Sequence, residues 1–442
     1  MKKIFYFIFL FLCCQASRAQ VLPNTATGAS SAQQVNPAPA GYTPGNSNNY
    51  VRTWVPQQPY TLESDVTAAG RTVNQVSRAT QYVDGLGRPL QTVSWQTTPG
   101  KTDMVAPQVY DAFGREQYKY LPYSSSGTDG TFKNTPFVDQ SNFYGSTYPA
   151  QQPAFSGEQF FYGHTQFEAS PLSRPLKTFA PGNSWAGSEG SSQEHGVKIQ
   201  YLINDATDNV RIWTITNNAL TYTTGDQTVN IPTSTAAYAG GQLYKTVTTD
   251  EAGKQVVEYK DKDGHVVLKK VQIADTPTDA YNGWLCTYYV YDDLGLLRFV
   301  IPPKAVSRLV ANNWPALPTD IINELCFRYE YDSRNRMIAK KVPGAAWVYM
   351  VYDVRDRLVF TQDGNMRNST QWLATLYDNL NRPIETAMMT GYTGNRQNLA
   401  DYVNGLTDGS TTLSQGSGTQ TLSTPADLLI SARETGRAAY DA

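Results

Sequence analysis

Apolar and polar positions alternate most clearly in the segment 324–332, which reads ELCFRYEYD. Leu325, Phe327, Tyr329 and Tyr331 fall on one side of an extended chain, while the residues between them fall on the other, because successive strand side chains point to opposite faces. The segment therefore predicts a strand that enters a turn at Asp332. The runs MIAKKV and LVFTQ further along supply returning strands, so the pattern predicts β-hairpins.

The same pattern recurs along the chain as an aspartate followed three residues later by Gly, Asn or Asp. Its seven copies are Asp84 with Gly87, Asp111 with Gly114, Asp261 with Gly264, Asp292 with Gly295, Asp332 with Asn335, Asp353 with Asp356, and Asp378 with Asn381. The next residue is an arginine in five copies: Arg88, Arg115, Arg336, Arg357 and Arg382. It is His265 or Leu296 in the other two. A tyrosine directly precedes the aspartate in five copies, as Tyr110, Tyr291, Tyr331, Tyr352 and Tyr377, and stands one residue earlier in two, as Tyr82 and Tyr259.

Turn chemistry explains these residue types. An aspartate at the first position of a turn accepts hydrogen bonds from N–H groups ahead of it, and Gly, Asn and Asp best tolerate the left-handed backbone three residues later. We expect a positive φ at Gly87, Gly114, Gly264, Gly295 and Asn335. The arginine beside the turn is placed to pair with a carboxylate or to stack on a tyrosine across the strands.

A single strand-turn-strand unit cannot bury its apolar face alone, so we expect the units to stack. The prediction is an all-β fold in which stacked antiparallel hairpins form one continuous curled sheet from about Leu243 to Ala387. Equivalent tyrosines would then form ladders at about 5 Å along successive hairpins. These tyrosines are Tyr289, Tyr291, Tyr329, Tyr331, Tyr352 and Tyr377.

Composition supports a mostly β protein, since the 442 residues include 29 Tyr, 16 Phe and 8 Trp against 17% charged residues. The formal net charge is −2 and no long run of Lys or Arg occurs, which argues against a nucleic-acid partner.

The ends predict export. Residues 1–19 have the features of a signal peptide, with cleavage between Ala19 and Gln20, and their apolar run is shorter than the roughly 20 residues that span a bilayer. We expect a periplasmic, cell-surface or extracellular protein without a permanent membrane span. The expected segments are a low-complexity linker at 20–49, an amino-terminal β domain at 50–192, a β connecting region at 193–242 with paired strands, the repeat sheet at 243–389, and a polar tail at 390–442 that holds the possible start of further repeats.

The strings YDAFGR, YDDLGL, YDSRNR, YDVRDR and YDNLNR resemble the tyrosine-aspartate repeats of the rearrangement-hotspot (RHS) family, and YVDGLGRPLQTV resembles the amino-terminal domain of large exported bacterial RHS proteins. The resemblance covers about residues 50–387. It implies a spiral β-sheet that is part of a hollow shell, which encloses or presents a cargo such as a carboxy-terminal toxin. It also implies structural roles for the repeat residues and no catalytic residue. The expected partners are the remainder of a longer shell and its toxin.

Two other functions stay open. A surface adhesion or glycan-binding module would use aromatic residues such as Trp284, Trp347 and Trp372 as a sugar-stacking platform, although aromatic residues also fill sheet faces. A glycoside-active enzyme would need two facing carboxyls, whereas the adjacent Asp292 and Asp293 point to opposite faces of a strand.

Other chemical motifs are weak. His164, His195 and His265 stand in three different segments, so neither a triad nor a zinc site is expected. YKDKDGH fails as a calcium loop because Tyr259 and Lys270 stand at acidic ligand positions, and GKT at 100–102 lacks the first glycine of a phosphate loop. We expect no cofactor and no metal. Cys286 and Cys326 occupy equivalent places in neighbouring units, and we favour two free thiols over a disulfide.

Overall fold

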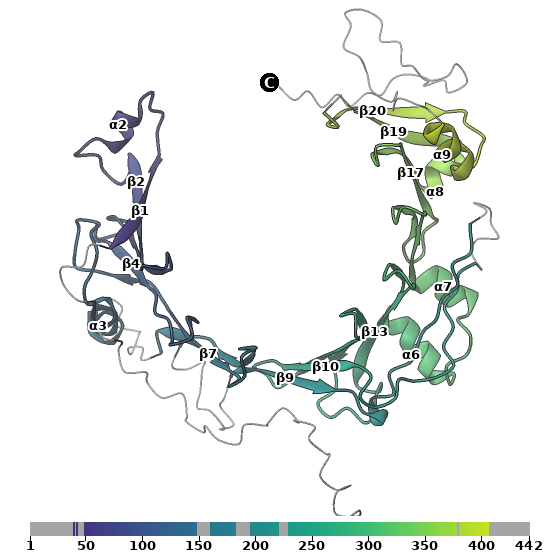
Figure 1. Cartoon of the computed structure of the whole chain (residues 1–442), viewed down its shortest axis with the longest axis horizontal. Coiled ribbons are helices and arrows are strands. Elements are labelled where there is room, and N and C mark those ends of the chain that lie inside the picture. The colour runs from purple at the N-terminus through teal and green to yellow at the C-terminus, as the bar shows by residue number, and fades with distance from the viewer. Residues whose placement is uncertain are drawn as a thin grey trace, which may run out of the picture. The chain divides into compact units, whose positions relative to one another are not determined.

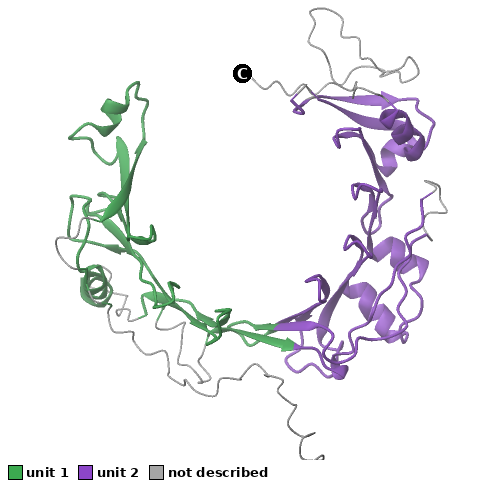
Figure 2. Cartoon of the chain, in the orientation of Figure 1, with its two compact units in different colours: residues 1–202, 247–255 green, residues 203–246, 256–442 purple. Residues whose placement is uncertain are grey.

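The structure is a computed structural model that describes residues 39, 41–42, 48–147, 160–182, 195–220, 229–377 and 380–405. The chain divides into two compact units: unit 1 holds residues 1–202 and 247–255, and unit 2 holds residues 203–246 and 256–442 (Figure 2). Both units consist mainly of antiparallel strands (Figure 1). The predicted signal peptide, its cleavage site at Ala19 and Gln20, and residues 406–442 of the polar tail lie outside the described residues.

Two sheets account for the described strands, one with five strands and one with fifteen. The five-stranded sheet lies in unit 1 and has the order β1-β2-β3-β4-β6, with β1 (Asn49–Pro56), β2 (Val76–Val83), β3 (Pro89–Ser94), β4 (Met104–Pro107) and β6 (Tyr123–Ser124). Unit 1 also holds β5 (Tyr118–Tyr120), β7 (Tyr162–Phe167), β8 (Pro175–Phe179) and nearly all of β9 (Val197–Ile203), which belong to the larger sheet. Its helices are α2 (Glu63–Thr67), α3 (Pro136–Asn142) and the π-helix η2 (Phe143–Thr147).

Strand order follows chain order without a crossover from β10 to β20. The strands are β10 (Tyr244–Thr249), which has residues in both units, β11 (Gln255–Lys260), β12 (Val266–Gln272), β13 (Trp284–Tyr291), β14 (Leu297–Ile301), β15 (Phe327–Tyr331), β16 (Met337–Lys341), β17 (Val348–Tyr352), β18 (Leu358–Gln362), β19 (Gln371–Tyr377) and β20 (Pro383–Thr390). The prediction that the repeat units form one continuous antiparallel sheet is confirmed.

A β-bulge lies beside the turn in the hairpins β2–β3, β7–β8, β11–β12, β13–β14, β15–β16, β17–β18 and β19–β20. In hairpin β15–β16, for example, Glu330 is opposite Ala339 but Tyr331 is opposite Met337, so Ile338 is the extra residue. The extra residue always stands two positions after the arginine position of the repeat, as Leu90, Leu176, Val267, Arg298, Ile338 and Val359. A bulge increases the local twist of the strand pair, so these hairpins share the same distortion.

The predicted tyrosine ladder is wrong in its spacing. Tyr291, Tyr331, Tyr352 and Tyr377 lie on β13, β15, β17 and β19, and the returning strand of each hairpin separates one from the next. Neighbouring strands lie about 4.8 Å apart, so equivalent residues on alternate strands are about twice that distance apart. Another side chain must therefore fill the space between successive tyrosines.

The side chains that are buried also differ from those that the alternation of apolar and polar residues predicts. In β15 the arginine and glutamate positions are buried, with Arg328 0% and Glu330 4% exposed, whereas Phe327, Tyr329 and Tyr331 are half-buried. The face that reads as polar is thus the covered face of the sheet. The reason is a long segment that lies over it.

This segment, called here the covering segment, comprises the described residues 203–220 and 229–243 of unit 2. Paired strands were predicted between Val197 and Asn230, but β9 pairs with β8, and beyond the short 3-10 helix η3 (Ala206–Asp208) the segment forms only two isolated bridges among the described residues. Side chains of the sheet hold its backbone instead: Arg328 donates to the carbonyl of Val229 at 2.6 Å, and the N–H of Arg211 donates to the Tyr288 hydroxyl at 2.8 Å. The strand prediction is confirmed for β9, but its predicted pairing with residues 209–218 is wrong, because residues 210–214 bond irregularly to 233–238 instead.

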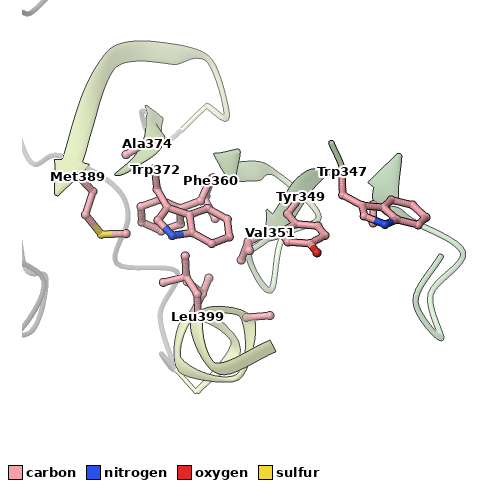
Figure 3. Packing of buried hydrophobic residues seen from close by; sticks show 12 residues of the cluster. Trp347, Tyr349, Val351, Phe360, Trp372, Ala374, Met389 and Leu399 are labelled. Carbon is pink, nitrogen blue, oxygen red and sulfur yellow. The ribbon is translucent and has the colours of Figure 1, made fainter. Parts of the chain in front are cut away.

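Helices cover other parts of unit 2. They are α6 (Pro303–Ala311), α7 (Thr319–Leu325), α8 (Gly364–Asn368) and α9 (Arg396–Asn404). Helix α9 lies in the predicted polar tail and begins with a capping box between Asn395 and Asn398. It packs against β17, and Figure 3 shows Leu399 pointing toward Trp372 and Phe360 in the buried cluster. The part of the tail next to the sheet is therefore an element of the core.

Gly264 offers a test of the turn backbone. Its φ is +88° and no atom lies within 4 Å of an added Cβ, so a substitution there changes backbone strain without a steric clash. We expect Gly264→Val to destabilise unit 2 by about 1–3 kcal/mol, because a β-branched residue is strained in the left-handed region. Urea denaturation measures the loss.

Gly264→Asn is the matched control. Asn335 has a φ of 59° at the equivalent position, so asparagine is compatible with this turn. The asparagine variant should lose clearly less stability than the valine variant, and equal losses would contradict the strained-turn explanation.

Candidate functional site

A single carboxylate closes each repeat turn. In the β15–β16 turn, Oδ1 of Asp332 accepts hydrogen bonds from the N–H groups of Arg334 at 2.9 Å and Arg336 at 3.0 Å. The N–H of Asn335 donates to the carbonyl of Asp332, and the N–H of Asp332 donates to the carbonyl of Arg336. Local backbone geometry therefore depends on one aspartate side chain.

The same pair of bonds to Oδ1 occurs at seven aspartates among the described residues: Asp84, Asp111, Asp250, Asp261, Asp292, Asp332 and Asp353. Asp378 lies outside the described residues. The predicted positive φ is confirmed, with values of 80° at Gly87, 77° at Gly114, 88° at Gly264, 74° at Gly295 and 59° at Asn335. Asp356 and Asn381 share it, with φ of 61° and 63°.

The repeat arginine connects one hairpin to the next. Its Nε donates to the second oxygen of its own aspartate, at 2.8 Å between Arg336 and Asp332 and at 2.7 Å between Arg357 and Asp353. The same guanidinium lies over the tyrosine of the following hairpin, with 5.0 Å from Arg336 to the Tyr352 ring. Three further pairs repeat this contact: Arg88 over Tyr110 at 4.6 Å, Arg357 over Tyr377 at 5.1 Å, and the His265 ring stacked on Tyr291 at 4.6 Å. Both predicted roles of the arginine are thus found together.

A third contact reaches the left-handed residue of the next turn. Nη1 of Arg336 donates to Oδ1 of Asp356 at 2.8 Å, and Nη1 of Arg357 donates to Oδ1 of Asn381 at 3.3 Å. Where that residue is glycine, the arginine of the preceding hairpin lies close to where a side chain would be: a Cβ added to Gly114 would lie 3.0 Å from Nη1 of Arg88. An arginine from the preceding hairpin thus lies beside the left-handed residue whether that residue is Gly, Asn or Asp.

The hydroxyls of two repeat tyrosines add a hydrogen bond to the preceding hairpin. The hydroxyl of Tyr331 donates to the carbonyl of Leu297 at 3.1 Å, and that of Tyr377 donates to Leu358 at 2.9 Å. Each acceptor is the first residue of the returning strand in the preceding hairpin. We call these aspartate, arginine and tyrosine contacts together the repeat-turn network.

The network lowers the pKa of three of its carboxyls, those of Asp84, Asp111 and Asp332. Burial by itself raises the pKa of Asp332, but hydrogen bonds from the Arg336 side chain and from the N–H groups of Arg336 and Arg334 outweigh it, so the pKa is lower than usual. Asp84 and Asp111 have lowered pKa values for the same balance of causes. These three turns are therefore held by ionised carboxylates at neutral pH.

One hairpin departs from the pattern. Leu296 stands where Asp292 needs an arginine, and Arg298, two residues further on at the bulge, reaches Oδ2 of Asp292 at 3.2 Å instead. Arg298 is 1% exposed and also pairs with Glu330 and donates to Oδ1 of Asn217 at 2.9 Å. The displaced arginine thereby holds the covering segment as well as its own turn.

The sequence pattern missed two turns. Asp250 with Gly253 closes a turn of the same geometry, but Thr249 and Lys254 replace the tyrosine and arginine. Glu168 and Arg174 close a longer turn between β7 and β8, with Nη2 of Arg174 at 2.8 Å from Oε2 of Glu168. Arg174 lies 4.2 Å from the Tyr201 ring, whose hydroxyl donates to the carbonyl of Pro175. The first turn could have been found from its Asp-x-x-Gly spacing alone. The second has a glutamate and a longer spacing, so the motif does not match it.

Groups with other chemistry are dispersed. His164 lies in β7 and stacks on Tyr118 at 4.6 Å, and His265 belongs to the repeat-turn network. Asp261, Asp263 and His265 are the group of described residues whose atoms lie close enough to hold a metal, within 4.8 Å of one another. Oδ1 of Asp261 already closes its turn and Oδ2 contacts His265, so the turn itself explains this group.

The cysteines are both buried and free, as favoured from the sequence. Burial raises the pKa of Cys286 to about 11 and that of Cys326 to about 12, which makes reactive thiolates scarce at neutral pH.

Trp347 and Trp372 are 6% and 1% exposed, so the sugar-stacking platform considered for them is wrong. They fill the sheet core, and Trp284 is half-buried beside Lys270. No described helix has the length and apolar character needed to cross a membrane.

A family model described as a domain of unknown function (DUF6443) matches residues 52–199. No match is found among curated proteins.

The chain is similar in structure to TcdB2-TccC3. The crystal structure of TcdB2-TccC3-TEV matches with a TM-score of 0.43 at 13% identity, over 73% of this chain and 13% of that chain. TcdB2-TccC3-Cdc42 matches with a TM-score of 0.44 at 14% identity, over 72% and 13%. A Tc holotoxin pore from Photorhabdus luminescens matches with a TM-score of 0.42 at 14% identity, over 72% and 13%. The chain thus spans about 13% of the length of these proteins.

Arg336 and Tyr352 provide a test of the repeat-turn network. We expect Arg336→Leu to destabilise unit 2 by about 1.5–3 kcal/mol, because charge-assisted hydrogen bonds are lost. In a double-mutant cycle with Tyr352→Leu, the coupling energy should be about 0.5–2 kcal/mol, the range of a cation–π contact. Urea denaturation of the four proteins gives both values.

Arg334→Leu is the control for this cycle. Arg334 pairs with Asp356, but the two side chains are 50% and 49% exposed, so the pair is worth only about 0.2–1 kcal/mol. A coupling energy of zero between Arg336 and Tyr352 would show that the guanidinium does not connect the hairpins.

Acid should weaken the turns. The pKa of Asp332 in the folded protein lies below its unfolded value of about 3.9, so its stabilising contribution is complete above that pH and is lost as the pH falls through the folded-state pKa. We expect Asp332→Asn to be less stable than the wild type at pH 6 but to lose less stability between pH 4 and pH 2. Parallel pH curves for the two proteins would contradict this origin of the acid sensitivity.

Proposed function

We propose that this chain is a non-enzymatic structural scaffold, the amino-terminal part of an exported shell of tyrosine-aspartate repeats that encloses or presents a cargo such as a carboxy-terminal toxin. The observation that carries the proposal is that the repeat residues hold the hairpins together. The aspartate, arginine and tyrosine of the described repeats bond mainly to one another and to the backbone, as at Asp332, Arg336 and Tyr352. Residues that recur with a shared structural task indicate a wall built of equivalent units.

A structural role is favoured over a catalytic one by the state of the titratable groups. The described repeat aspartates carry lowered pKa values or accept several hydrogen bonds, which suits fixed turn closure rather than proton transfer. His164 and His265 lie in separate strands and turns and contact aromatic rings. The buried thiols of Cys286 and Cys326 have raised pKa values, which argues against nucleophilic chemistry.

The geometry of the hairpins also supports a wall of considerable length. Neighbouring hairpins make equivalent contacts on both sides: Arg357 lies over Tyr377 of the following hairpin, whose hydroxyl donates to Leu358, while the left-handed Asp356 accepts a hydrogen bond from Arg336 of the preceding hairpin. Units that present equivalent contacts on both sides can be added in series. Together with the resemblance of the repeat strings to the RHS family, this supports a shell that is long enough to surround a polypeptide.

Protease protection tests the proposal. The intact gene product, purified from the exported fraction of its natural host, should begin at Gln20 and should keep its carboxy-terminal region resistant to trypsin under native conditions. The combined substitution Arg336→Leu and Arg357→Leu should open the wall and expose that region, because two consecutive connections between hairpins are removed. Mass spectrometry of the fragments over time gives the rates.

Arg334→Leu is again the matched control and should leave protection unchanged. A carboxy-terminal region that is digested equally fast in the wild type and in the double variant would overturn the enclosing role. A cytoplasmic product with Met1 intact would overturn export, and turnover of a substrate by the purified protein would overturn the non-enzymatic role.

A further inference from the structure

A cavity of about 430 Å³ opens on the covered face of the sheet in unit 2. It lies between the covering segment at Asn217–Leu220, the β15–β16 repeat turn and helix α9. Its lining includes Glu330 and Ile338 from the hairpin and Asn404 from the end of the helix. Volumes of roughly 300–1,000 Å³ are typical of sites for small molecules.

Glu330 is a buried carboxylate with one oxygen still available. The residue is 4% exposed, and its Oε2 accepts hydrogen bonds from Arg298 and from Nδ2 of Asn230. Its Oε1 has no hydrogen-bond partner among the described residues. An ionised carboxylate oxygen only accepts hydrogen bonds, so an oxygen of Glu330 that lines the cavity favours a ligand that donates.

Burial raises the pKa of Glu330, although Arg298, Arg328 and Asn230 all act to lower it. A hydrogen-bond donor at Oε1 would stabilise the ionised form further.

Two more lining groups offer oxygen atoms. The hydroxyl of Ser333 has no partner among the described residues, and Asn404 uses its Nδ2 on the carbonyl of Ala400, which leaves its Oδ1 open in that same part of the structure. The available atoms are thus two acceptors and one hydroxyl, from the sheet, the turn and the helix.

The charges that line the cavity are already balanced. Arg336 pairs with Asp332 at 2.7 Å and with Asp356 at 2.8 Å, and Nε of Arg396 donates to the carbonyl of Met350 at 2.9 Å. Glu330 has Arg298 as its counterion. The two lining carboxylates are balanced by two lining guanidinium groups, so the cavity has no net charge that would select an ion. These residues are Glu330, Asp332, Arg336 and Arg396. Ile338, Leu220 and Ala400 add apolar patches to the same lining.

We propose that this cavity binds a small neutral molecule that is rich in hydroxyl groups, of the mono- or disaccharide class. Its hydroxyls donate to Oε1 of Glu330 and Oδ1 of Asn404 and exchange a hydrogen bond with Ser333, and its C–H faces contact the apolar patches. The site is distinct from the tryptophan platform excluded above, since neither Trp347 nor Trp372 lines the cavity. It also does not depend on the scaffold function.

Saturation-transfer NMR on the full chain tests the site, with glucose, N-acetylglucosamine, maltose and cellobiose as probes. We expect saturation transfer to at least one of the four. Asn404→Trp should abolish the signal because the indole fills the cavity, and Ser333→Ala should weaken binding about two- to tenfold through the loss of one neutral hydrogen bond.

Asn368→Trp is the matched control, because Asn368 is the exposed last residue of α8 as Asn404 is the last residue of α9. This control should retain the signal, and circular dichroism should show the same fold in all variants. Failure of all four sugars to bind the wild type would overturn the proposal. Unchanged affinity in Ser333→Ala and in a folded Asn404→Trp would overturn it too, as would binding of inorganic phosphate or lysine in the cavity in place of a sugar. Should Asn404→Trp fail to fold, Ser333→Ala decides alone.

Discussion

The structure depends on the carboxylate of the repeat aspartate. One oxygen closes the turn of its own hairpin, and the other orients an arginine that contacts the next hairpin, as Asp353 does through Arg357 toward Tyr377. A guanidinium can serve both purposes because it carries five donors in a rigid plane whose face also stacks on an aromatic ring. Turn closure and the connection between hairpins are therefore one interaction, and a change at the aspartate affects both.

This coupling suits hairpins that are weak by themselves. A two-stranded hairpin is marginally stable in water, so most of the stabilising free energy must come from contacts between neighbours. The burial of the Asp353 and Arg357 side chains, at 1% and 5% exposed, shows how far such contacts extend into the wall. Charged groups remain tolerable there because every oxygen of the pair has a donor.

The covered face follows a different principle. Backbone bonds within the covering segment join 210–214 to 233–238, and the sheet adds side chains such as Arg328 and Tyr288, which satisfy further carbonyl and N–H groups. Arg298 belongs to this arrangement because it serves Asp292 and Asn217 together. The hairpin that departs from the repeat is thus the one that connects the regular wall to an irregular segment. The nearby cavity is lined by residues 217–220 of the covering segment and by α9.

The sequence by itself determined the repeat turns, because their chemistry is local: an aspartate, a left-handed residue three positions later and an arginine after it interact within five residues. It also determined the continuous antiparallel sheet, since every copy carries the same strand period. The tertiary structure decided which face is buried, because that depends on the covering segment and α9, which are distant in sequence. It likewise decided that an arginine separates successive tyrosines, that Arg298 replaces the missing arginine at Leu296, and that Glu330 lies buried beside a cavity. These outcomes rest on contacts between residues that are far apart in sequence or shifted in register, and a local pattern contains no information about them.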